Sequence, residues 1–288
     1  MKKMICVFLA AVMSLSLAGC SFGFGTPPKD ADKYTAGNAE IKGKVESLEI
    51  EWTMGRLDIV QGKGNAVVLE ESYSGELPDE KKMHWYLDGT TLKVRYDMLT
   101  GPGVTAEKSL TVTVPEDLHL KEVTLSVISA NMNAVDLSAD AAEVAATSGD
   151  VTISFRDALT EGSFAVTSGD LKTGFSGPVG KLAVSTVSGD LQIDAGDRIG
   201  ELKVSSVSGD LTADLDEAPG NTRIETTSGD IEMTLPGDAD LSLEYETVSG
   251  ELRSEVAFAN EGDTYISGSG ENPMHISTVS GKITILKS

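Results

Sequence analysis

Apolar and polar residues alternate along most of the chain, and the alternation recurs at a fixed interval. The tripeptide Ser-Gly-Asp occupies residues 148–150 and returns every 20 residues as far as residues 228–230. One apolar residue precedes each of these serines by four positions, and another follows it by three. Alternation with a period of two predicts strands. A period in this range predicts a solenoid in which each repeat is one coil of the chain.

The repeat extends beyond the identical tripeptides. Ser129-Ala130-Asn131 precedes them, and Ser249-Gly250-Glu251 and Ser280-Gly281-Lys282 follow them. The apolar column before the serine comprises Leu125, Val144, Phe164, Val184, Val204, Ile224, Tyr245 and Ile276. The apolar column after it comprises Met132, Val151, Leu171, Leu191, Leu211, Ile231, Leu252 and Ile283. Each column is expected to line the interior, with one residue from each coil.

A corner is expected at each Ser-Gly-Asp. Val184 and Leu191 are an odd number of residues apart, so simple alternation cannot turn both toward the interior. Glycine permits a positive φ or a bulge that resets the alternation. The glycines predicted to be structural for this reason are Gly149, Gly169, Gly189, Gly209, Gly229, Gly250 and Gly281. Successive coils should then pair in parallel, about 4.8 Å apart.

The predicted fold is all-β: a parallel β-helix, or β-solenoid, with an irregular β cap at its N-terminal end. Residues 40–122 form the cap, in which Asp88-Gly89 marks a hairpin between two alternating segments. A first coil is expected about Gly55. Residues 123–288 form the solenoid, and an insertion near residues 258–273, rich in Gly, Ser, Asn and Glu, predicts a protruding loop or hairpin.

The coils are expected to stack in the order of the chain. The segment that ends at Ser288 would then form the free end of the stack, where an exposed sheet edge needs protection. Lys282 and Lys287 are suited to that role, since lysine is a common means of protecting edges.

The first residues predict export and a lipid anchor. Residues 1–19 carry Lys2 and Lys3 followed by an apolar stretch too short to span a bilayer as a mature helix. This segment ends in Leu-Ala-Gly before Cys20, which resembles the lipobox of bacterial lipoproteins and implies lipidation of Cys20 after cleavage. Residues 20–39 are rich in Gly and Pro near their start and predict a flexible tether. The expected location is the outer face of the cell membrane, or the outer membrane in a cell that has one.

Charge and composition restrict the partners. The chain has 288 residues, a formal net charge of −22 and an aromatic content of 5%. Removal of a signal segment that contains two lysines and no acid would make the mature protein more negative still. No basic stripe is present, so nucleic-acid binding is excluded. The low aromatic content argues against a lectin-type stacking groove.

The repeats Thr-Val-Ser-Gly-Asp-Leu, preceded by Leu-Thr-Val-Thr-Val-Pro at residues 110–115, resemble the bacterial β-strand-repeat domain labelled "putative adhesin". This is a domain family of unknown function, and the resemblance covers roughly residues 40–288. It implies an exported or membrane-attached protein and a right-handed β-helix. It implies no particular activity.

An acidic column follows the corner glycines: Asp150, Asp170, Asp190, Asp210, Asp230 and Glu251. Two interpretations are open. Carboxylates stacked in a ladder suit a hard cation such as Ca²⁺. Alternatively, Ser and Asp side chains cap backbone groups at a Gly corner, which is ordinary turn chemistry. The second is favoured because the calcium-binding nonapeptide of β-rolls is absent and Lys282 breaks the column. No cofactor is therefore expected.

Catalytic and metal-ligating candidates are few. The Ser and Thr columns are interpreted as structural ladders, because no His keeps register with them. His84, His119 and His275 lack ligand spacing, so no metal site is expected. Trp52 and Trp85 are assigned to the N-terminal core or cap. An enzyme acting on polysaccharides, as many β-helices do, would draw on one of two sets: Asp194, Asp197 and Arg198, or Asp214, Asp216 and Glu217.

The functional hypothesis is a lipid-anchored envelope protein that acts by surface contact, without catalysis, on an extended partner such as a wall glycan or another envelope protein. The insertion near residues 258–273 is the expected site of specificity, because loops on a rigid scaffold carry function. The alternatives are the polysaccharide-degrading enzyme and a regulatory partner of an envelope-stress system.

Overall fold

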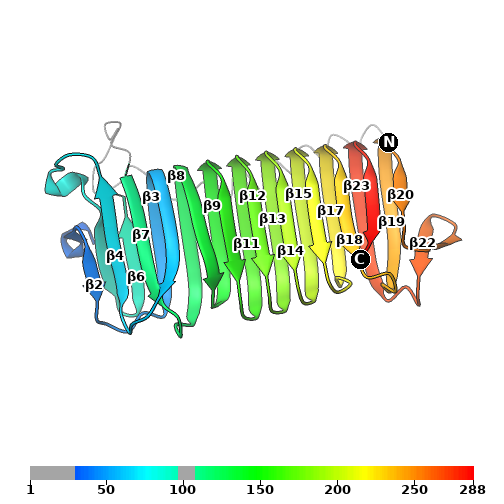
Figure 1. Ribbon diagram of the computed structural model, residues 1–288. Helices are drawn as coiled ribbons and strands as arrows, with labels where there is room; N and C mark the ends of the chain where they lie inside the picture. Colours follow the sequence, from blue (N-terminus) through cyan, green and yellow to red (C-terminus); the bar gives the residue numbers. More distant parts are fainter. Residues whose placement is uncertain (1–29, 97–107) are drawn as a thin grey trace.

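The structure is a computed structural model, and it describes residues 30–96 and 108–288. The predicted signal segment, Cys20 and the first part of the tether lie outside the described residues. The described chain is all-β, with two short 3-10 helices and 24 strands linked into one hydrogen-bonded network that is mostly parallel (Figure 1). No helix in these ranges has the length and apolar character needed to cross a membrane.

The N-terminal end is the irregular part of the fold. Its elements are η1 (Ala31–Lys33), β1 (Thr35–Ala36), β2 (Ala39–Ile41), β3 (Ser47–Gly62), β4 (Val67–Tyr73), η2 (Asp79–Lys81), β5 (His84–Asp88), β6 (Thr91–Arg95) and β7 (Lys108–Pro115). Most pairings among β1, β2, β4, β5, β6 and β7 are antiparallel. The hairpin expected at Asp88-Gly89 is confirmed as β5–β6, with Gly89 at φ +64°.

The stack begins within this region. Strand β8 (Leu120–Leu137) pairs in parallel with β3, so that Leu48 stands opposite Val123 and Gly55 opposite Ala130. The coil expected about Gly55 is therefore present, with Gly55 at φ +96°. The expected boundary at residue 122 lies inside β8.

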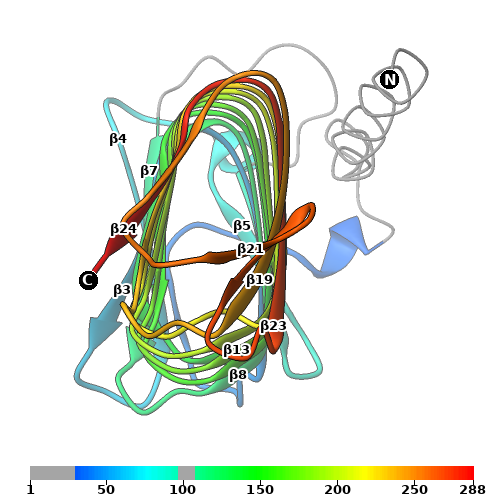
Figure 2. The ribbon, with the colours of Figure 1, turned by 90° about the vertical axis from the view of Figure 1, so that its right-hand side faces the viewer.

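The regular coils alternate long and short strands. The long ones are β9 (Ala139–Ser148), β11 (Leu159–Ser168), β13 (Val179–Ser188), β15 (Ile199–Ser208), β17 (Asn221–Ser228), β19 (Leu241–Ser249) and β23 (Asn272–Ser280). The short ones are β10 (Val151–Phe155), β12 (Leu171–Phe175), β14 (Leu191–Ala195), β16 (Leu211–Leu215), β18 (Ile231–Leu235), β20 (Leu252–Ser254) and β24 (Ile283–Lys287). Viewed along the stack, the coils enclose a flattened tube (Figure 2).

Long strands pair with long strands and short with short, and the register matches the predicted columns. Val184 stands opposite Val204, and Leu191 stands opposite Leu211. Both columns line the interior of the regular coils, where Val204, Leu211 and Ile224 are at most 1% exposed. The members in the outermost coil, Tyr245 and Leu252, are only half-buried. The hydrophobic effect that stabilises the fold therefore acts along one continuous row of apolar side chains.

The corners adopt the backbone conformation that requires glycine. Gly189 has φ +127°, and a Cβ placed on it would lie 2.0 Å from the carbonyl oxygen of Gly169 in the preceding coil. The other regular corners repeat this geometry. Gly250 is the exception among the predicted glycines, since its φ lies outside the positive region, although a Cβ there would still meet the Gly281 carbonyl oxygen at 2.1 Å.

The last coils do not stack in the order of the chain, which corrects the expected order. Strand β23 lies between β17 and β19, with Ile276 opposite both Ile224 and Tyr245. The coil β19–β20 therefore forms the free end, and the C-terminal coil β23–β24 is internal (Figure 1). The inward side chains are consistent with this order: Ile276, Ile283 and Ile285 of the inner coil are fully buried, and they stand opposite the less apolar set Tyr245, Leu252 and Ser254 of the outer coil. Lys282 and Lys287 accordingly do not protect the end of the stack.

The insertion forms a hairpin at this free end. Strands β21 (Ala259–Glu261) and β22 (Thr264–Ser267) pair antiparallel, and β22 continues antiparallel along the first residues of β19. In the view along the stack, β21 crosses the end of the coils (Figure 2).

A column of hydroxyl groups lies inside the tube near this end. Each member has a hydroxyl oxygen that is buried and has no hydrogen-bond partner among the described residues: Thr186, Ser206, Thr226, Thr278 and Thr247. These residues stand opposite one another on successive long strands. Leaving a buried hydroxyl without a partner is unfavourable.

Replacement of one such hydroxyl should stabilise the protein. We expect Thr226→Val to raise the free energy of unfolding by about 1 kcal/mol, because valine has nearly the same shape and no polar atom to desolvate. Urea denaturation measures the change, and Thr227→Val on the outward side of the same strand is the control, with an expected change within about 0.5 kcal/mol. Destabilisation by Thr226→Val would instead indicate that a buried water bridges the hydroxyls.

Candidate functional site

The acidic column forms a ladder of turn caps. The backbone N–H of Asp190 donates to Oδ1 of Asp170 at 2.9 Å, and that of Asp210 donates to Oδ1 of Asp190 at 2.9 Å. The same bond links the other regular corners, begins at the side chain of Asn131 and ends where the N–H of Lys282 donates to Asp230. Glu251 belongs to the outermost coil. Each of the aspartates from Asp150 to Asp230 thus satisfies a backbone donor of the next coil, as in turn chemistry, whereas the Glu251 side chain pairs with Arg253 at 2.7 Å.

If the aspartates act as turn caps, loss of the acceptor oxygen should destabilise the protein, whereas loss of the negative charge or addition of calcium should not. We expect Asp190→Ala to lower the free energy of unfolding by about 1 kcal/mol, because the Asp210 N–H loses its acceptor. Asp190→Asn keeps an acceptor oxygen and removes repulsion between neighbouring carboxylates, so it should be neutral or stabilising at low salt. Thermal melting with and without millimolar Ca²⁺ is the measurement, and a rise in Tm with calcium would support the cation ladder instead.

A recess of about 520 Å³ opens where the inserted hairpin meets β19 and β23 at the free end of the stack. Glu244, Tyr245 and Glu246 line it from β19, and His275 lines it from β23. Gly262, Asp263 and Tyr265 line it from the hairpin. The insertion that the sequence marked as the expected site of specificity therefore contributes one wall of this recess.

The recess combines aromatic rings with carboxylates. The Tyr245 and Tyr265 rings lie 5.5 Å apart between centroids, and Phe258 packs edge-on against Tyr265 at 6.5 Å. The hydrogen bond with Tyr265 raises the pKa of Tyr245, so the Tyr245 phenol stays protonated at neutral pH. Such a recess offers stacking surfaces, hydroxyl donors and carboxylate acceptors within one small volume. It suits a sugar ring or a cationic side chain.

A second, smaller hollow of about 200 Å³ lies on the outer face of β9, β11, β13 and β15. Its floor is made of small side chains: Ala145, Ser163, Ala165, Ala183, Ser185 and Ser205. Glu143 and Lys203 are the charged residues at its margin. A flat, hydroxyl-bearing surface of this kind suits contact with an extended partner, but it holds no convergent set of reactive groups.

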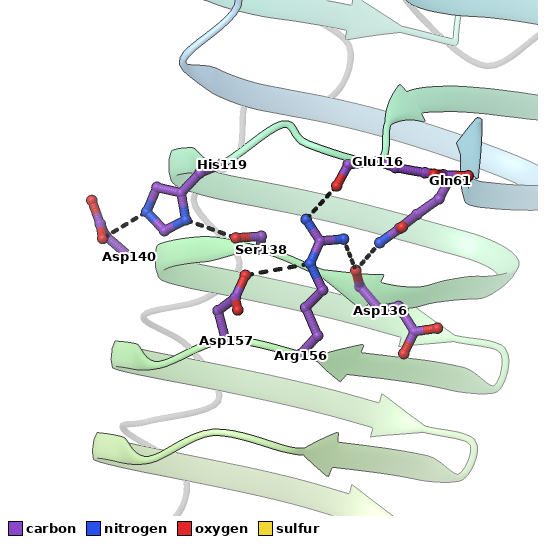
Figure 3. Close-up of polar contacts among 8 residues, drawn as sticks. All are labelled: Gln61, Glu116, His119, Asp136, Ser138, Asp140, Arg156 and Asp157. Carbon is purple, nitrogen blue, oxygen red and sulfur yellow. Dashed lines mark hydrogen bonds and ion pairs between the residues drawn. The ribbon is translucent and has the colours of Figure 1, made fainter. Parts of the chain in front are cut away.

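A polar cluster lies at the junction of β8 and β9, beside the end of β10 (Figure 3). The Arg156 guanidinium donates to the carbonyl of Asp136 at 3.0 Å and to that of Glu116 at 2.6 Å, and it pairs with Asp157 at 3.3 Å. Asp136 has φ +57°, an uncommon conformation outside glycine. Arg156 thus ties this strained corner to the turn that follows β7.

The same cluster holds a Ser, His and Asp arrangement that the sequence analysis missed. His119 Nδ1 lies 2.7 Å from the Ser138 hydroxyl, and Nε2 lies 2.9 Å from Asp140. Ser138 and Asp140 lie two residues apart at the junction of β8 and β9, and His119 lies beside them on the preceding coil, just before β8. They share no sequence spacing typical of a catalytic motif.

Two features separate this arrangement from a nucleophile site. The hydrogen bond from Ser138, with Arg156 and His119 nearby, lowers the pKa of Asp157. Ser138 has a single hydroxyl proton, and it cannot donate that proton to Asp157 and to His119 at the same time. Ser138 is also only 4% exposed, whereas a nucleophile must be reached by its substrate. The geometry is that of a hydrogen-bonded corner.

The residues proposed for the enzyme alternative lie apart from any such recess. Asp194 and Asp214 stand opposite each other on β14 and β16, and Asp194 accepts hydrogen bonds from Gln192. Arg198 donates to Asn272 at 2.8 Å. The remaining members are Asp197, whose carboxylate accepts the Arg198 N–H, and the exposed residues Asp216 and Glu217. Across residues 30–96 and 108–288, no group of three or more His, Cys, Asp or Glu side chains is placed to hold a metal ion.

Comparisons with known proteins point to one family. A family model described as Toastrack DUF4097 matches residues 45–286. None of the curated proteins compared with the chain matches it.

Several solved structures are similar. A "putative adhesin" from Bacteroides fragilis is 16% identical, with a TM-score of 0.44, over 90% of this chain and 99% of that one. A "putative cell adhesion protein" from Clostridium sporogenes is 14% identical, with a TM-score of 0.28, over 89% and 99%. A "putative lipid binding protein" from Parabacteroides distasonis is 10% identical, with a TM-score of 0.35, over 88% and 97%.

Proposed function

For a chain that belongs to the Toastrack DUF4097 family, a family of unknown function, we propose the role of a lipid-anchored protein of the cell envelope. It binds an extended partner at its surface and performs no catalysis. The lipid is carried on Cys20. The expected tether is shorter than residues 20–39, because η1 (Ala31–Lys33) and β1 (Thr35–Ala36) already belong to the folded body, where β1 pairs with β5. The partner is a wall glycan or another envelope protein.

The recess at the free end of the stack carries this proposal. It gathers Tyr245, Tyr265 and Asp263 between an inserted hairpin and the last coil. The regular coils supply a rigid support, because each is held to its neighbours by parallel ladders and by the corner caps. A variable segment mounted on a rigid scaffold is a common arrangement for binding sites.

The winding of the chain is part of the same proposal. We take the coils to wind to the right, with about 20 residues in each, since a strand that crosses over to a parallel neighbour does so right-handedly in nearly all known sheets. An experimental structure of the protein tests both the hand and the coil length.

Binding is tested with the full-length protein in mild detergent and a panel of purified wall glycans, followed by analysis of the glycans for cleavage. We expect retention on at least one glycan or crosslinking to an envelope protein in intact cells, and loss of retention in Tyr265→Ala. Tyr86→Ala is the matched control, since Tyr86 is also half-buried and packed against a tyrosine, but at the other end. Cleaved glycan would favour the polysaccharide-degrading alternative, and the absence of any partner would refute the binding role.

Lipid anchoring has its own test. In cells fed a labelled fatty acid, the wild-type protein should carry the label and sediment with membranes, whereas Cys20→Ala should do neither. An unlabelled wild-type protein released into the medium would contradict the anchor.

A further inference from the structure

The outermost strand of the stack has an open edge. Strand β19 pairs along its inner side with β23 from Leu241 to Ser249. On its outer side β22 pairs only with residues 241–243. No strand in the described ranges continues along residues 244–249. Alternate residues of an edge strand direct N–H and C=O groups outward, so this edge presents unpaired donors and acceptors.

The open segment has the length of an ordinary strand, since strands in proteins most often contain about five or six residues. The open segment begins where β22 stops pairing with β19, at Leu243 opposite Tyr265. The next residue of the hairpin, Thr264, pairs with Glu261 inside the hairpin. Proteins usually protect such edges with charge, bulges or covering segments. Here the covering stops after three residue pairs, and an added strand could continue the row that β22 begins.

The side chains beside this edge select a partner. Glu244 and Glu246 are exposed on the outer face of β19. Val248, two residues further on the same face, is 68% exposed and is the one large apolar residue so exposed in the described part of the chain. Asp263 lines the adjoining recess. An incoming strand that places basic side chains on this face would meet complementary charge, whereas an acidic one would be repelled.

A second copy of the chain fits poorly at this edge. Pairing two β19 edges would bring the glutamates of one copy against those of the other, in a protein with a formal net charge of −22. Like charges that face each other across strands are destabilising. The charge pattern therefore favours a different and basic polypeptide.

We propose that the outer edge of β19 accepts an extended segment of a partner polypeptide as an added strand. Alternate Lys or Arg residues of the partner face Glu244 and Glu246, and its backbone completes the ladder along residues 244–249. The inference rests on the proposed binding function and names the partner as a protein rather than a glycan. It uses strand addition, a known mode of peptide recognition.

The test uses a synthetic peptide, Thr-Lys-Thr-Lys-Thr-Lys-Thr, blocked at both ends and labelled with a fluorophore. Its symmetry allows parallel or antiparallel pairing. Binding to the full-length protein in mild detergent is followed by fluorescence anisotropy. We expect saturable binding that protects the amides of residues 244–249 from hydrogen exchange. N-methylation of the peptide at alternate residues leaves its charge intact but removes ladder hydrogen bonds, and it should abolish binding.

Protein variants separate the edge from general charge attraction. Glu244→Lys/Glu246→Lys should weaken binding of the lysine peptide by about tenfold or more and should favour a peptide with Glu in place of Lys. The matched control is Glu161→Lys/Glu232→Lys, which makes the same change of charge at exposed sites on internal coils. Circular dichroism confirms that both variants fold.

Other results of these binding experiments would contradict strand addition by a basic partner. Undiminished binding of the N-methylated peptide, or equal loss in the control variant, would overturn strand addition in favour of non-specific attraction. Absence of peptide binding while a wall glycan is retained would overturn this inference and leave the proposed function intact. Failure of both would overturn the proposed function as well. Self-association of the wild-type protein that Glu244→Lys/Glu246→Lys abolishes would identify a second copy as the occupant and refute the basic partner.

Discussion

Gly189→Ala should lower the free energy of unfolding by about 3 kcal/mol or more, as measured by urea denaturation. Two effects cause this destabilisation. Alanine at φ +127° is strained, and its Cβ would lie 2.0 Å from the Gly169 carbonyl oxygen. That oxygen is backbone, so it cannot move aside as a flexible side chain could. Relief of the contact requires two coils to separate locally, which disturbs the ladder on both sides of the corner.

Gly196→Ala is the matched control in the same coil. Its φ is not in the positive region, and the nearest atom to a new Cβ would be 3.7 Å away. We expect the free energy of unfolding to change by less than about 1 kcal/mol, because alanine fits here without a clash and also restricts the unfolded chain. Equal effects of the two substitutions would show that the corner tolerates a side chain and that the close stacking of coils described here is wrong.

Lys108→Met should be comparably destabilising, by about 3–5 kcal/mol, because it leaves a buried carboxylate without its partner. The side chains of Lys108 and Glu71 are 0% and 1% exposed, and Nζ lies 2.6 Å from Oε1. The ammonium also donates to the carbonyls of Lys81 and Tyr96, and it lies 3.8 Å from the centre of the Tyr96 ring. This one cation therefore joins β4, β7, the turn at residue 81 and the end of β6.

The double variant Lys108→Met/Glu71→Gln isolates the charge. Glutamine retains an acceptor for the Met83 N–H, which donates to Glu71 at 2.8 Å. With no buried charge left, we expect the double variant to be at least about 2 kcal/mol more stable than Lys108→Met alone. Strictly additive losses in urea denaturation would refute the interpretation that the uncompensated carboxylate causes the damage.

The coil interior was predictable from the sequence because it depends on local rules. Alternation assigns each residue to the inside or the outside, and a glycine corner resets it. The predicted columns containing Val184 and Leu191 are in register with their neighbours in the structure. The hairpin at Asp88-Gly89 follows from turn chemistry in the same way. Family membership was also indicated, since the repeat itself carries the resemblance.

The candidate site was predictable only in part. The broken period near residues 258–273 indicated where an insertion would project, and the hairpin there lines the recess. The sequence did not indicate that Tyr265 would pack against Tyr245, or that His119 would meet Ser138 and Asp140. These contacts join residues from different coils or from outside the repeat. Tyr265 lies outside the repeat, so no spacing rule applies to it. His119 and Ser138 are 19 residues apart, which is one coil, so the repeat period was the signal that could have placed them side by side.

The sequence by itself determined the all-β class, the inward columns and the corner glycines, because each follows from periodicity or from the steric limits of a single residue. Only the tertiary structure decided which coil ends the stack. Both β19–β20 and β23–β24 carry the repeat and could pair with β17–β18, so the local pattern does not distinguish them. The difference lies at the equivalent inward positions. The inner coil places Ile276, Ile283 and Ile285 in the interior, and the outer coil places Tyr245, Leu252 and Ser254 opposite them. Placing the more apolar coil inside removes more apolar surface from water, and it leaves the acidic edge of β19 open.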